Sequence, residues 1–275
     1  MASWTKAWTD ILNGGSKRWK VDDIDAKRRA LSRIVEHQYR HGTIIIPPTN
    51  EVDDVVVDVA HLPKLRILCP LAGDDPFVHY AWSQGHDVTA IDIVPDALGV
   101  MRGMFGDDAD DWSSSTKASA TALVEEEEEE GERGGDGENN DDGNDGTTVV
   151  WKHKSGRATL LEGNVLTRRP ELTNSFDAVY DKDSFGALSL TDRRAFCTRI
   201  SDYIKDGGTL YVEVKYKDQG RGSGGPPYHV EKEDLMDPSN FGISFEYVRF
   251  LGEVYPLNVD GMKQTGHILK RASRR

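Results

Sequence analysis

A glycine turn between two apolar segments constrains the fold of this 275-residue chain more than any other feature. Residues 65–71 read as a buried strand that runs into Gly73 and Asp74, and residues 86–92 read as a second strand that ends in Asp92. A short helical stretch, residues 76–84, separates them. Further strands alternate with helical segments along the chain, which predicts one α/β domain built on a mostly parallel sheet.

The spacing of the turn and the acid predicts a nucleoside-binding site. In nucleotide-binding α/β folds, a carboxylate about 20 residues after the glycine turn accepts hydrogen bonds from ribose hydroxyls. This turn lacks the G-x-G-x-x-G spacing and carries Asp74 and Asp75, whose charges we expect to repel a pyrophosphate. A nicotinamide oxidoreductase is therefore disfavoured. A nucleoside without phosphates fits better, and S-adenosylmethionine is the common one.

The acidity of the chain is confined to one segment. The formal net charge is −13, yet the stretch between Gly106 and Gly146 holds 16 of the 47 acidic residues and two of the 34 basic ones. Outside it, acids and bases number 31 and 32. This stretch has too few apolar residues to order itself, so we predict a disordered acidic insertion over residues 107–146. It is either a solvated spacer or a tail that engages a basic partner.

Composition argues against several other classes of protein. The two cysteines, Cys69 and Cys197, fit no zinc or redox spacing, and the histidines show no metal-ligand spacing. We therefore expect no metal. No basic patch points to nucleic acid, and no apolar run approaches the ~20 residues of a membrane span. The N-terminus has no secretory signal pattern. These features predict a cytoplasmic protein, expected to be a monomer, that binds neither nucleic acid nor a membrane.

The remaining segments complete the expected domain. Residues 1–45 are expected to form an N-terminal lid segment and a helix. After the second strand, the expected elements are a helix over 95–105, a hairpin of 147–154 and 157–162, a strand over 176–181, a helix over 191–205, a strand over 209–216, a short helix near 231–236, and a final antiparallel pair over 244–251 and 265–271.

Candidate site residues follow the carboxyl ends of the expected parallel strands, where ligands bind in open α/β sheets. Gly73 would allow close backbone approach, and Asp92 would hold the ribose unless it only caps the next helix. The ends of the first four strands and the loop after the fifth supply the other candidates: Leu71, Ile93, Asn164, Val165, Asp181, Lys182, Asp183 and residues 225–228.

Three further observations extend this set. Lys182 stands between two aspartates and is either a cation that faces the substrate or part of a surface ion pair. Trp4 and Trp8 share a helical face at the N-terminus, and their indoles suit a lid over a cationic sulfonium. His229 is the one histidine that we expect near the site.

These pieces, taken in order, resemble the thiopurine S-methyltransferase family, which includes halide and thiol methyltransferases. The resemblance rests on Trp4-x3-Trp8, on residues 70–73 (PLAG), 91–93 (IDI), 163–166 (GNVL) and 176–182 (FDAVYDK), and on the distinctive residues 224–228 (GGPPY). It spans nearly the whole chain outside the insertion. Lys182 stands where the thiopurine enzymes commonly carry arginine, and Asp74 replaces the usual lysine of the turn.

The resemblance implies a Rossmann-like class I methyltransferase. Its seven-stranded, mostly parallel sheet would have an antiparallel last strand and helices on both faces, and S-adenosylmethionine would be the methyl donor. It implies cofactor contacts by Trp4, Trp8, Leu71, Asp92, Asn164, Val165 and Lys182, and it places Trp19 in the acceptor pocket. From their positions after the strands we add Gly73, Ile93 and Asp181 as cofactor contacts, and Lys182, Pro227 and Tyr228 as acceptor contacts. We expect catalytic roles for Lys182 and Tyr228.

The sequence leaves two functions open. In the first, the chain moves a methyl group to a small soft nucleophile such as a thiol, hydrosulfide or halide, with thiopurine-like thiols also possible. In the second, a catalytically weak or inactive methyltransferase fold uses its acidic insertion to engage a basic partner.

Overall fold

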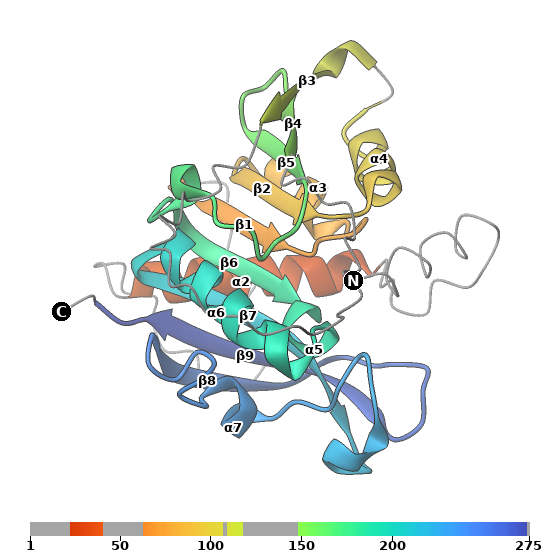
Figure 1. Cartoon of the computed structure of the whole chain (residues 1–275). Coiled ribbons are helices and arrows are strands. Elements are labelled where there is room, and N and C mark those ends of the chain that lie inside the picture. The colour runs from red at the N-terminus through yellow and green to blue at the C-terminus, as the bar shows by residue number, and fades with distance from the viewer. Residues whose placement is uncertain (1–22, 41–62, 107–108, 118–147, 274–275) are drawn as a thin grey trace, which may run out of the picture.

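The computed structural model of the chain describes residues 23–40, 63–106, 109–117 and 148–273. Their strands form one sheet in the order β3-β4-β5-β2-β1-β6-β7-β9-β8 (Figure 1). The strands are β1 Arg66–Pro70, β2 Asp87–Asp92, β3 Trp112–Lys117, β4 Thr148–His153, β5 Ala158–Glu162, β6 Phe176–Lys182, β7 Ile204–Lys217, β8 Phe245–Tyr255 and β9 Met262–Arg271.

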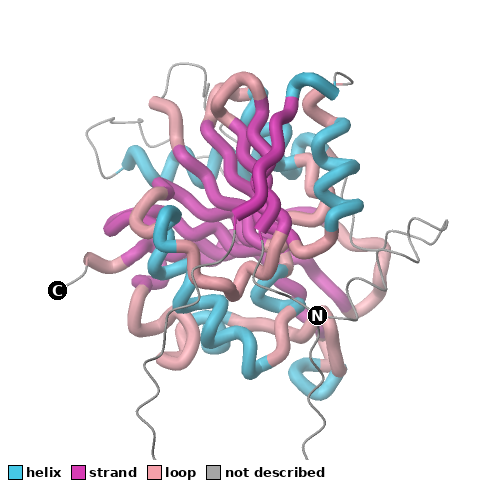
Figure 2. Tube along the Cα trace, turned by 45° about the horizontal axis from the view of Figure 1, so that its top comes forward, coloured by secondary structure: helices cyan, strands magenta, loops and turns pink. Residues whose placement is uncertain are grey.

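Helices cover both faces of this sheet, and Figure 2 shows the strands as a central layer. The helices are α2 Ile24–Arg40, α3 Phe77–Ser83, α4 Pro95–Gly103, α5 Ser184–Ala187, α6 Leu190–Tyr203 and α7 Lys232–Leu235, with short 3-10 turns η2 Ala109–Asp111, η3 Pro170–Leu172 and η4 Gly220–Ser223. No helix in these described residues is long and apolar enough to cross a membrane.

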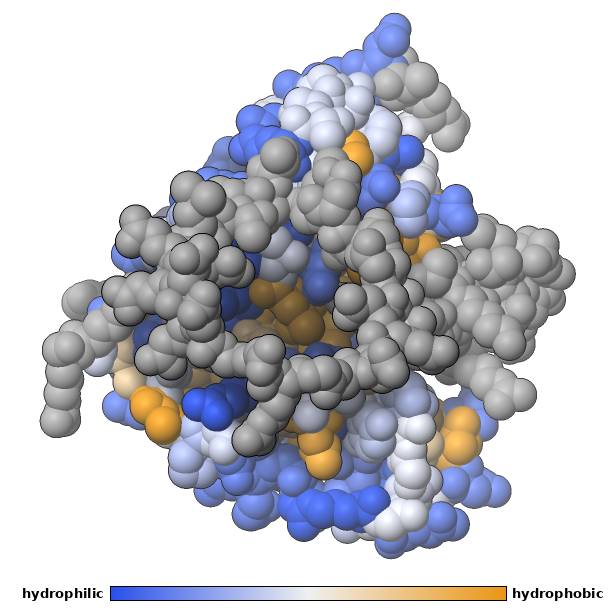
Figure 3. Space-filling view, viewed as in Figure 1, coloured by the Kyte–Doolittle hydropathy of each residue, from blue (hydrophilic) through white to orange (hydrophobic). Residues whose placement is uncertain are grey.

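Alternation along the central strands divides the core into two hydrophobic clusters. On β7, Tyr211 belongs to the cluster packed by α2, α3 and α4, whereas Val212 belongs to the cluster packed by α5, α6 and α7. Successive side chains of a strand point to opposite faces, so each face has its own core. The surface seen in Figure 3 is mainly hydrophilic, with a few separate apolar groups.

The predicted fold class is confirmed, with a difference in strand number. Five neighbouring strands, β5, β2, β1, β6 and β7, run parallel. The last strand, β9, runs antiparallel to both β7 and β8, as expected. Nine strands are present in the described part of the chain instead of seven, because β3 and β4 extend the edge beyond β5.

The strand β3 corrects the predicted boundary of the acidic insertion. Residues 109–117 were expected to be disordered, but they form η2 and a strand that pairs with β4 over six residues. Trp112 contacts the rings of Phe105 and His153, with centroid distances of 5.2 and 5.1 Å. Backbone pairing and these ring contacts outweigh the local acidity, which the composition alone did not reveal. The rest of the predicted insertion lies outside the described residues.

Candidate active site

The turn after β1 is shaped by two residues with left-handed backbone. Leu71 has φ 43° and Gly73 has φ 54°. Glycine adopts this conformation readily, whereas leucine pays a steric cost. Backbone strain of this kind persists where surrounding contacts hold it, and it concentrates at functional sites. Asp183, which follows the neighbouring strand β6, also has a positive φ of 66°. Leu71 and Asp183 therefore follow adjacent parallel strands, whereas the third non-glycine residue with positive φ in the described part of the chain, Asn174, precedes β6.

The carboxylate of Asp92 closes on this turn. Its Oδ2 accepts a 2.7 Å hydrogen bond from the backbone N–H of Gly73, and its Oδ1 accepts one of 2.9 Å from Val94. Asp92 is 5% exposed. Burial raises the pKa of this carboxyl above its ordinary value, although the backbone N–H groups of Val94, Gly73 and Ile93 oppose the shift. Each carboxylate oxygen has a further lone pair for a hydroxyl donor.

The negative charge of Asp75, the second acid of the turn, is balanced by two lysines inside the protein. Its Oδ2 lies 2.9 Å from Nζ of Lys27 on α2 and 3.6 Å from Nζ of Lys182, and its Oδ1 accepts from the N–H of Phe77. Burial acts to raise the pKa of Asp75, but the two lysines and the Phe77 N–H outweigh it and leave the pKa lowered. The expectation of two free charges at this turn is therefore wrong for Asp75.

Lys182 lies in a largely buried ion pair. Its side chain is only 10% exposed and pairs with Asp75, so it is not a surface ion pair, and its role as a cation that faces the substrate stays a prediction. Burial opposes its charge, yet Asp75, Asp183 and Glu213 together raise its pKa. Lys182 therefore stays protonated as part of a buried network at the carboxyl end of β6.

Sequence reasoning missed most of this network. Lys215 of β7 pairs with Asp183 at 2.9 Å and bonds to Gln264 of β9, which also donates to Asp183 at 3.1 Å. Glu213 accepts hydrogen bonds of 3.0 Å from the hydroxyls of two buried tyrosines, Tyr211 and Tyr255. The available signal was the alternation of Glu213 and Lys215 with valines in an otherwise apolar strand.

We call these residues the charged network: Lys27, Asp75, Lys182, Asp183, Glu213, Lys215 and Gln264. It contains three acids and three lysines, so its formal charges balance. The members come from α2, from the turns after β1 and β6, and from β7 and β9. Because a buried charge without a partner is costly, the network fixes these elements relative to one another at the sheet edge where Asp92 lies.

Asp181, the last buried residue of β6, provides a second acid at this edge. Its Oδ1 accepts from the N–H of Ser184 at 2.9 Å, while its buried Oδ2 has no hydrogen-bond partner within the described structure. Burial raises the pKa of Asp181 to about 7, although hydrogen bonds from Ser184 oppose the shift. Ser184 in turn donates from its hydroxyl to the carbonyl of Pro70 at 2.8 Å, which ties the end of β6 to the end of β1.

The candidates for the adenine side lie at the end of β5. The side-chain oxygen of Asn164 accepts from the N–H of Leu166 at 2.9 Å, and the carbonyl of Asn164 accepts from Arg169 at 2.8 Å. Val165 is fully buried in the core cluster on the α6 face, so its side chain serves packing. Ile93 is partly buried beside Val94. Asn164 and Ile93 flank Asp92 through the pairing of β2 with β5.

The loop after β7 contacts the helices that follow β6. The N–H of Tyr228 donates to the carbonyl of Gly186 at 2.8 Å, and the guanidinium of Arg193 lies 5.4 Å from the Tyr228 ring centroid. Pro227 precedes it and is partly buried. His229 accepts from the N–H of Lys217 at 2.9 Å and lies 3.4 Å from Glu231. The remaining site candidates, Trp4, Trp8 and Trp19, lie outside the described residues.

Comparisons with known proteins now bear on this arrangement. The family model described as thiopurine S-methyltransferase matches residues 119–247. Over these residues the chain is similar to the thiopurine S-methyltransferases. The predictions of this family, of its α/β fold and of S-adenosylmethionine as the cofactor are confirmed at that level. A search of curated proteins found no match.

Solved structures show the same fold in other methyltransferases. One is the 1,6-didemethyltoxoflavin-N1-methyltransferase of Burkholderia thailandensis, crystallised with 1,6-didemethyltoxoflavin and S-adenosylhomocysteine. It is 15% identical, with 99% of this chain and 88% of that chain covered and a TM-score of 0.57. Another is the N-methyltransferase NodS of Bradyrhizobium japonicum in complex with S-adenosylhomocysteine, at 11% identity, 98% and 99% coverage and a TM-score of 0.55. The likeness supports the fold.

Proposed function

We propose that this methyltransferase moves the methyl group of S-adenosylmethionine to a small soft nucleophile: a thiol, hydrosulfide or halide, or a thiopurine-like thiol. The observation that carries the proposal is the closure of the Asp92 carboxylate on the Gly73 turn at the carboxyl ends of β2 and β1. That geometry suits a ribose, because an ionised carboxylate accepts from two vicinal hydroxyls.

The donor carries a methyl group on a cationic sulfur and needs no metal. Asp92 would hold its ribose, with Leu71, Gly73 and Ile93 around the sugar and Asn164 and the backbone of Val165 at the base. Asp181 and Lys182 end β6, where the methionine portion would lie. Trp4 and Trp8 would cover the site and exclude water. Each of these assignments is proposed from the position of the residue in the fold or the sequence.

For a soft nucleophile the protein needs to supply little beyond alignment of the reactants and removal of water. Its electron pair forms the new bond to the methyl carbon, and the pair of the broken carbon–sulfur bond returns to the donor sulfur, which becomes neutral. A thiol acceptor loses its proton to solvent. Lys182 would stabilise the incoming anion, because its paired acids keep it protonated. Tyr228, Pro227 and Trp19 would shape the acceptor pocket.

Purified protein with labelled S-adenosylmethionine, screened against thiols, hydrosulfide, halides and thiopurine-like thiols, tests the proposal. Methyl transfer to at least one soft nucleophile, and none to amines or alcohols of similar size, is the expected result. Transfer only to nitrogen or oxygen acceptors would remove the acceptor class and leave the methyltransferase assignment intact. We further propose that the protein is a cytoplasmic monomer that binds neither nucleic acid nor a membrane.

A further inference from the structure

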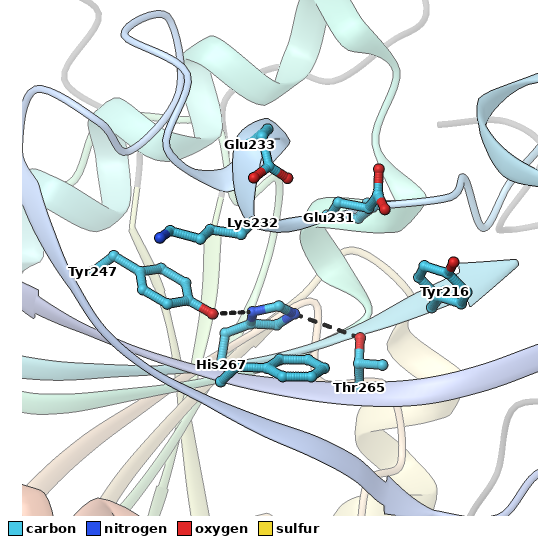
Figure 4. Close-up of a pocket in the computed structure, with 9 residues that line it drawn as sticks. Tyr216, Glu231, Lys232, Glu233, Tyr247, Thr265 and His267 are labelled. Carbon is cyan, nitrogen blue, oxygen red and sulfur yellow. Dashed lines mark hydrogen bonds between the residues drawn. The ribbon is translucent and has the colours of Figure 1, made fainter.

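A pocket of about 370 Å³ lies between α7 and the strands β8 and β9 (Figure 4). Three aromatic side chains line it, Tyr216 of β7 with Tyr247 and Phe250 of β8, and His267 of β9 lies among them. Its volume falls within the ~300–1,000 Å³ of small-molecule sites. None of the residues that line it was singled out as a site candidate from the sequence.

This pocket is separate from the site at Asp92. His267 lies on β9 and Asp92 on β2, with β1, β6 and β7 between them in the sheet. Four strand spacings of about 4.8 Å place them roughly 19 Å apart. On β9, Gln264 bonds to Asp183 and Lys215 in the charged network, whereas Thr265 and His267 line the pocket. Odd and even residues of β9 thus face opposite sides of the sheet.

The hydrogen bonds around His267 determine which ring nitrogen carries a proton. The hydroxyl of Thr265 donates to the carbonyl of Val214 at 3.3 Å, so its oxygen can only accept from Nε2 of His267. The tautomer with the hydrogen on Nε2 satisfies both contacts, because Nδ1 then accepts from the hydroxyl of Tyr247 at 2.9 Å. Burial lowers the pKa of His267 to about 4 despite the opposing charge of Glu233, which keeps the ring neutral.

The Nε2–H group of His267 makes only a weak hydrogen bond with Thr265. The contact between Nε2 and Thr265 Oγ1 is 3.5 Å long, at the outer limit for a hydrogen bond. A ligand acceptor that approaches Nε2 in the plane of the ring can replace this long contact. At the mouth, Phe250 is 56% exposed and its ring centroid lies 5.2 Å from that of His267. These two rings present an aromatic surface beside an underused donor.

Charged groups near the pocket belong to α7 and to Glu231, the residue that precedes it. The Lys232 ammonium lies 4.5 Å from the Tyr247 ring centroid, and Lys232 and Glu233 are both exposed. Glu231 is already engaged by His229 and Arg221, at 3.4 and 3.6 Å. Charges of both signs stand at the rim, so the rim favours neither a cationic nor an anionic ligand. Burial of an ionic ligand against the uncharged interior of the pocket would be costly.

We propose that this pocket binds a neutral, planar heteroaromatic molecule that carries a hydrogen-bond acceptor. The ring system packs against the side chains of Phe250 and Tyr247, and its acceptor atom accepts a hydrogen bond from Nε2 of His267. The site is additional to the methyl-transfer site and does not depend on the identity of the methyl acceptor.

Ligand-observed NMR on the full chain at pH 7.5 tests this site, with quinoline as the neutral probe. N-methylquinolinium and 2-naphthoate keep the two-ring plane but carry a positive and a negative charge, and naphthalene lacks the acceptor. We expect quinoline to bind at least fivefold more tightly than each of the other three. Saturating S-adenosylhomocysteine should leave its affinity unchanged. Equal binding of a charged probe, or displacement by S-adenosylhomocysteine, would overturn the proposal.

Two exposed residues of β8 supply the variant and its matched control. Phe250→Ser removes the ring at the pocket mouth, and Val248→Ser removes an apolar side chain that is 42% exposed and does not line the pocket. We expect F250S to weaken quinoline binding at least fivefold and V248S to change it less than twofold. Tyr247→Phe, which removes the partner of Nδ1, should weaken it two- to fivefold. Unchanged affinity in F250S, or equal loss in V248S, contradicts the assignment.

Discussion

The backbone N–H of Gly73 donates a 2.7 Å hydrogen bond to Oδ2 of Asp92, which joins the turn after β1 to the end of β2. The second carboxylate oxygen is held by Val94. A single side chain thus orders the turn and keeps free lone pairs at the sheet edge. Loop shape and ligand recognition depend on the same carboxylate.

Replacement of Asp92 by alanine should weaken S-adenosylhomocysteine binding at least 100-fold, about 2.7 kcal/mol, because charge-assisted bonds to the ribose and the order of the turn are both lost. Isothermal titration calorimetry measures this affinity. Asp96→Ala is the matched control, since Asp96 is an exposed acid in the first turn of α4. An affinity of D92A within threefold of the wild type would remove the ribose assignment.

Loss of Lys27 should destabilise the fold strongly. Its side chain is 1% exposed and pairs with Asp75, so Lys27→Met leaves a buried carboxylate with one partner fewer, at a cost of about 3–5 kcal/mol. Urea unfolding measures the change. Arg28→Met, which breaks the exposed pair with Asp25 one residue along the same helix, should cost less than about 1 kcal/mol. Similar losses in both variants would mean that the Lys27 pair contributes no more than a surface pair.

Asp181 should make stability depend on pH. Its pKa is about 7 in the folded protein and about 3.9 in the unfolded chain. A carboxyl whose folded pKa is raised stabilises the fold fully below its unfolded pKa, and this contribution is lost as the pH rises toward the folded pKa. Between pH 4 and pH 7, the wild type should therefore lose stability relative to Asp181→Asn.

Chemical denaturation of both proteins across this pH range checks the expectation. The difference in free energy of unfolding between D181N and the wild type should grow steadily in favour of D181N and level off above pH 7. A difference that stays constant from pH 4 to pH 8 would show that Asp181 is ionised in the folded protein throughout that range.

The edge hairpin predicts where the acidic segment can be shortened. Lys117 of β3 pairs directly with Thr148 of β4, so an Asn-Gly turn in place of residues 118–147 should connect them as a two-residue hairpin. We expect thermal unfolding within about 3 °C of the full chain and unchanged methyl transfer. Deletion of 109–147 also removes β3 and its Trp112 contacts. It should lower the midpoint of thermal unfolding by more than the Asn-Gly replacement does. Equal midpoints would mean that β3 adds nothing to the edge.

The order of elements was predictable from the sequence because it follows from local patterns. Apolar runs, the glycine turn and the acid at Asp92 predicted the strands and the turn that brings Gly73 and Asp92 together. The end of the helix over 191–205 was less accurate. It ends at Tyr203 and β7 begins at Ile204, since pairing of Ile204 with Phe176 of β6 extends the strand past the glycines.

The sequence by itself determined the α/β class and the order of the strands whose carboxyl ends supply the candidate site residues, because periodicity and spacing are local properties. Only the tertiary structure decided the partners of the charges. Lys182 and Asp75 are 107 positions apart, and Lys215 and Gln264 come from different strands, so no spacing rule links them. Their ionisation and their burial depend on which side chains the sheet and α2 bring within a few ångströms of one another. That arrangement forms only when the core packs.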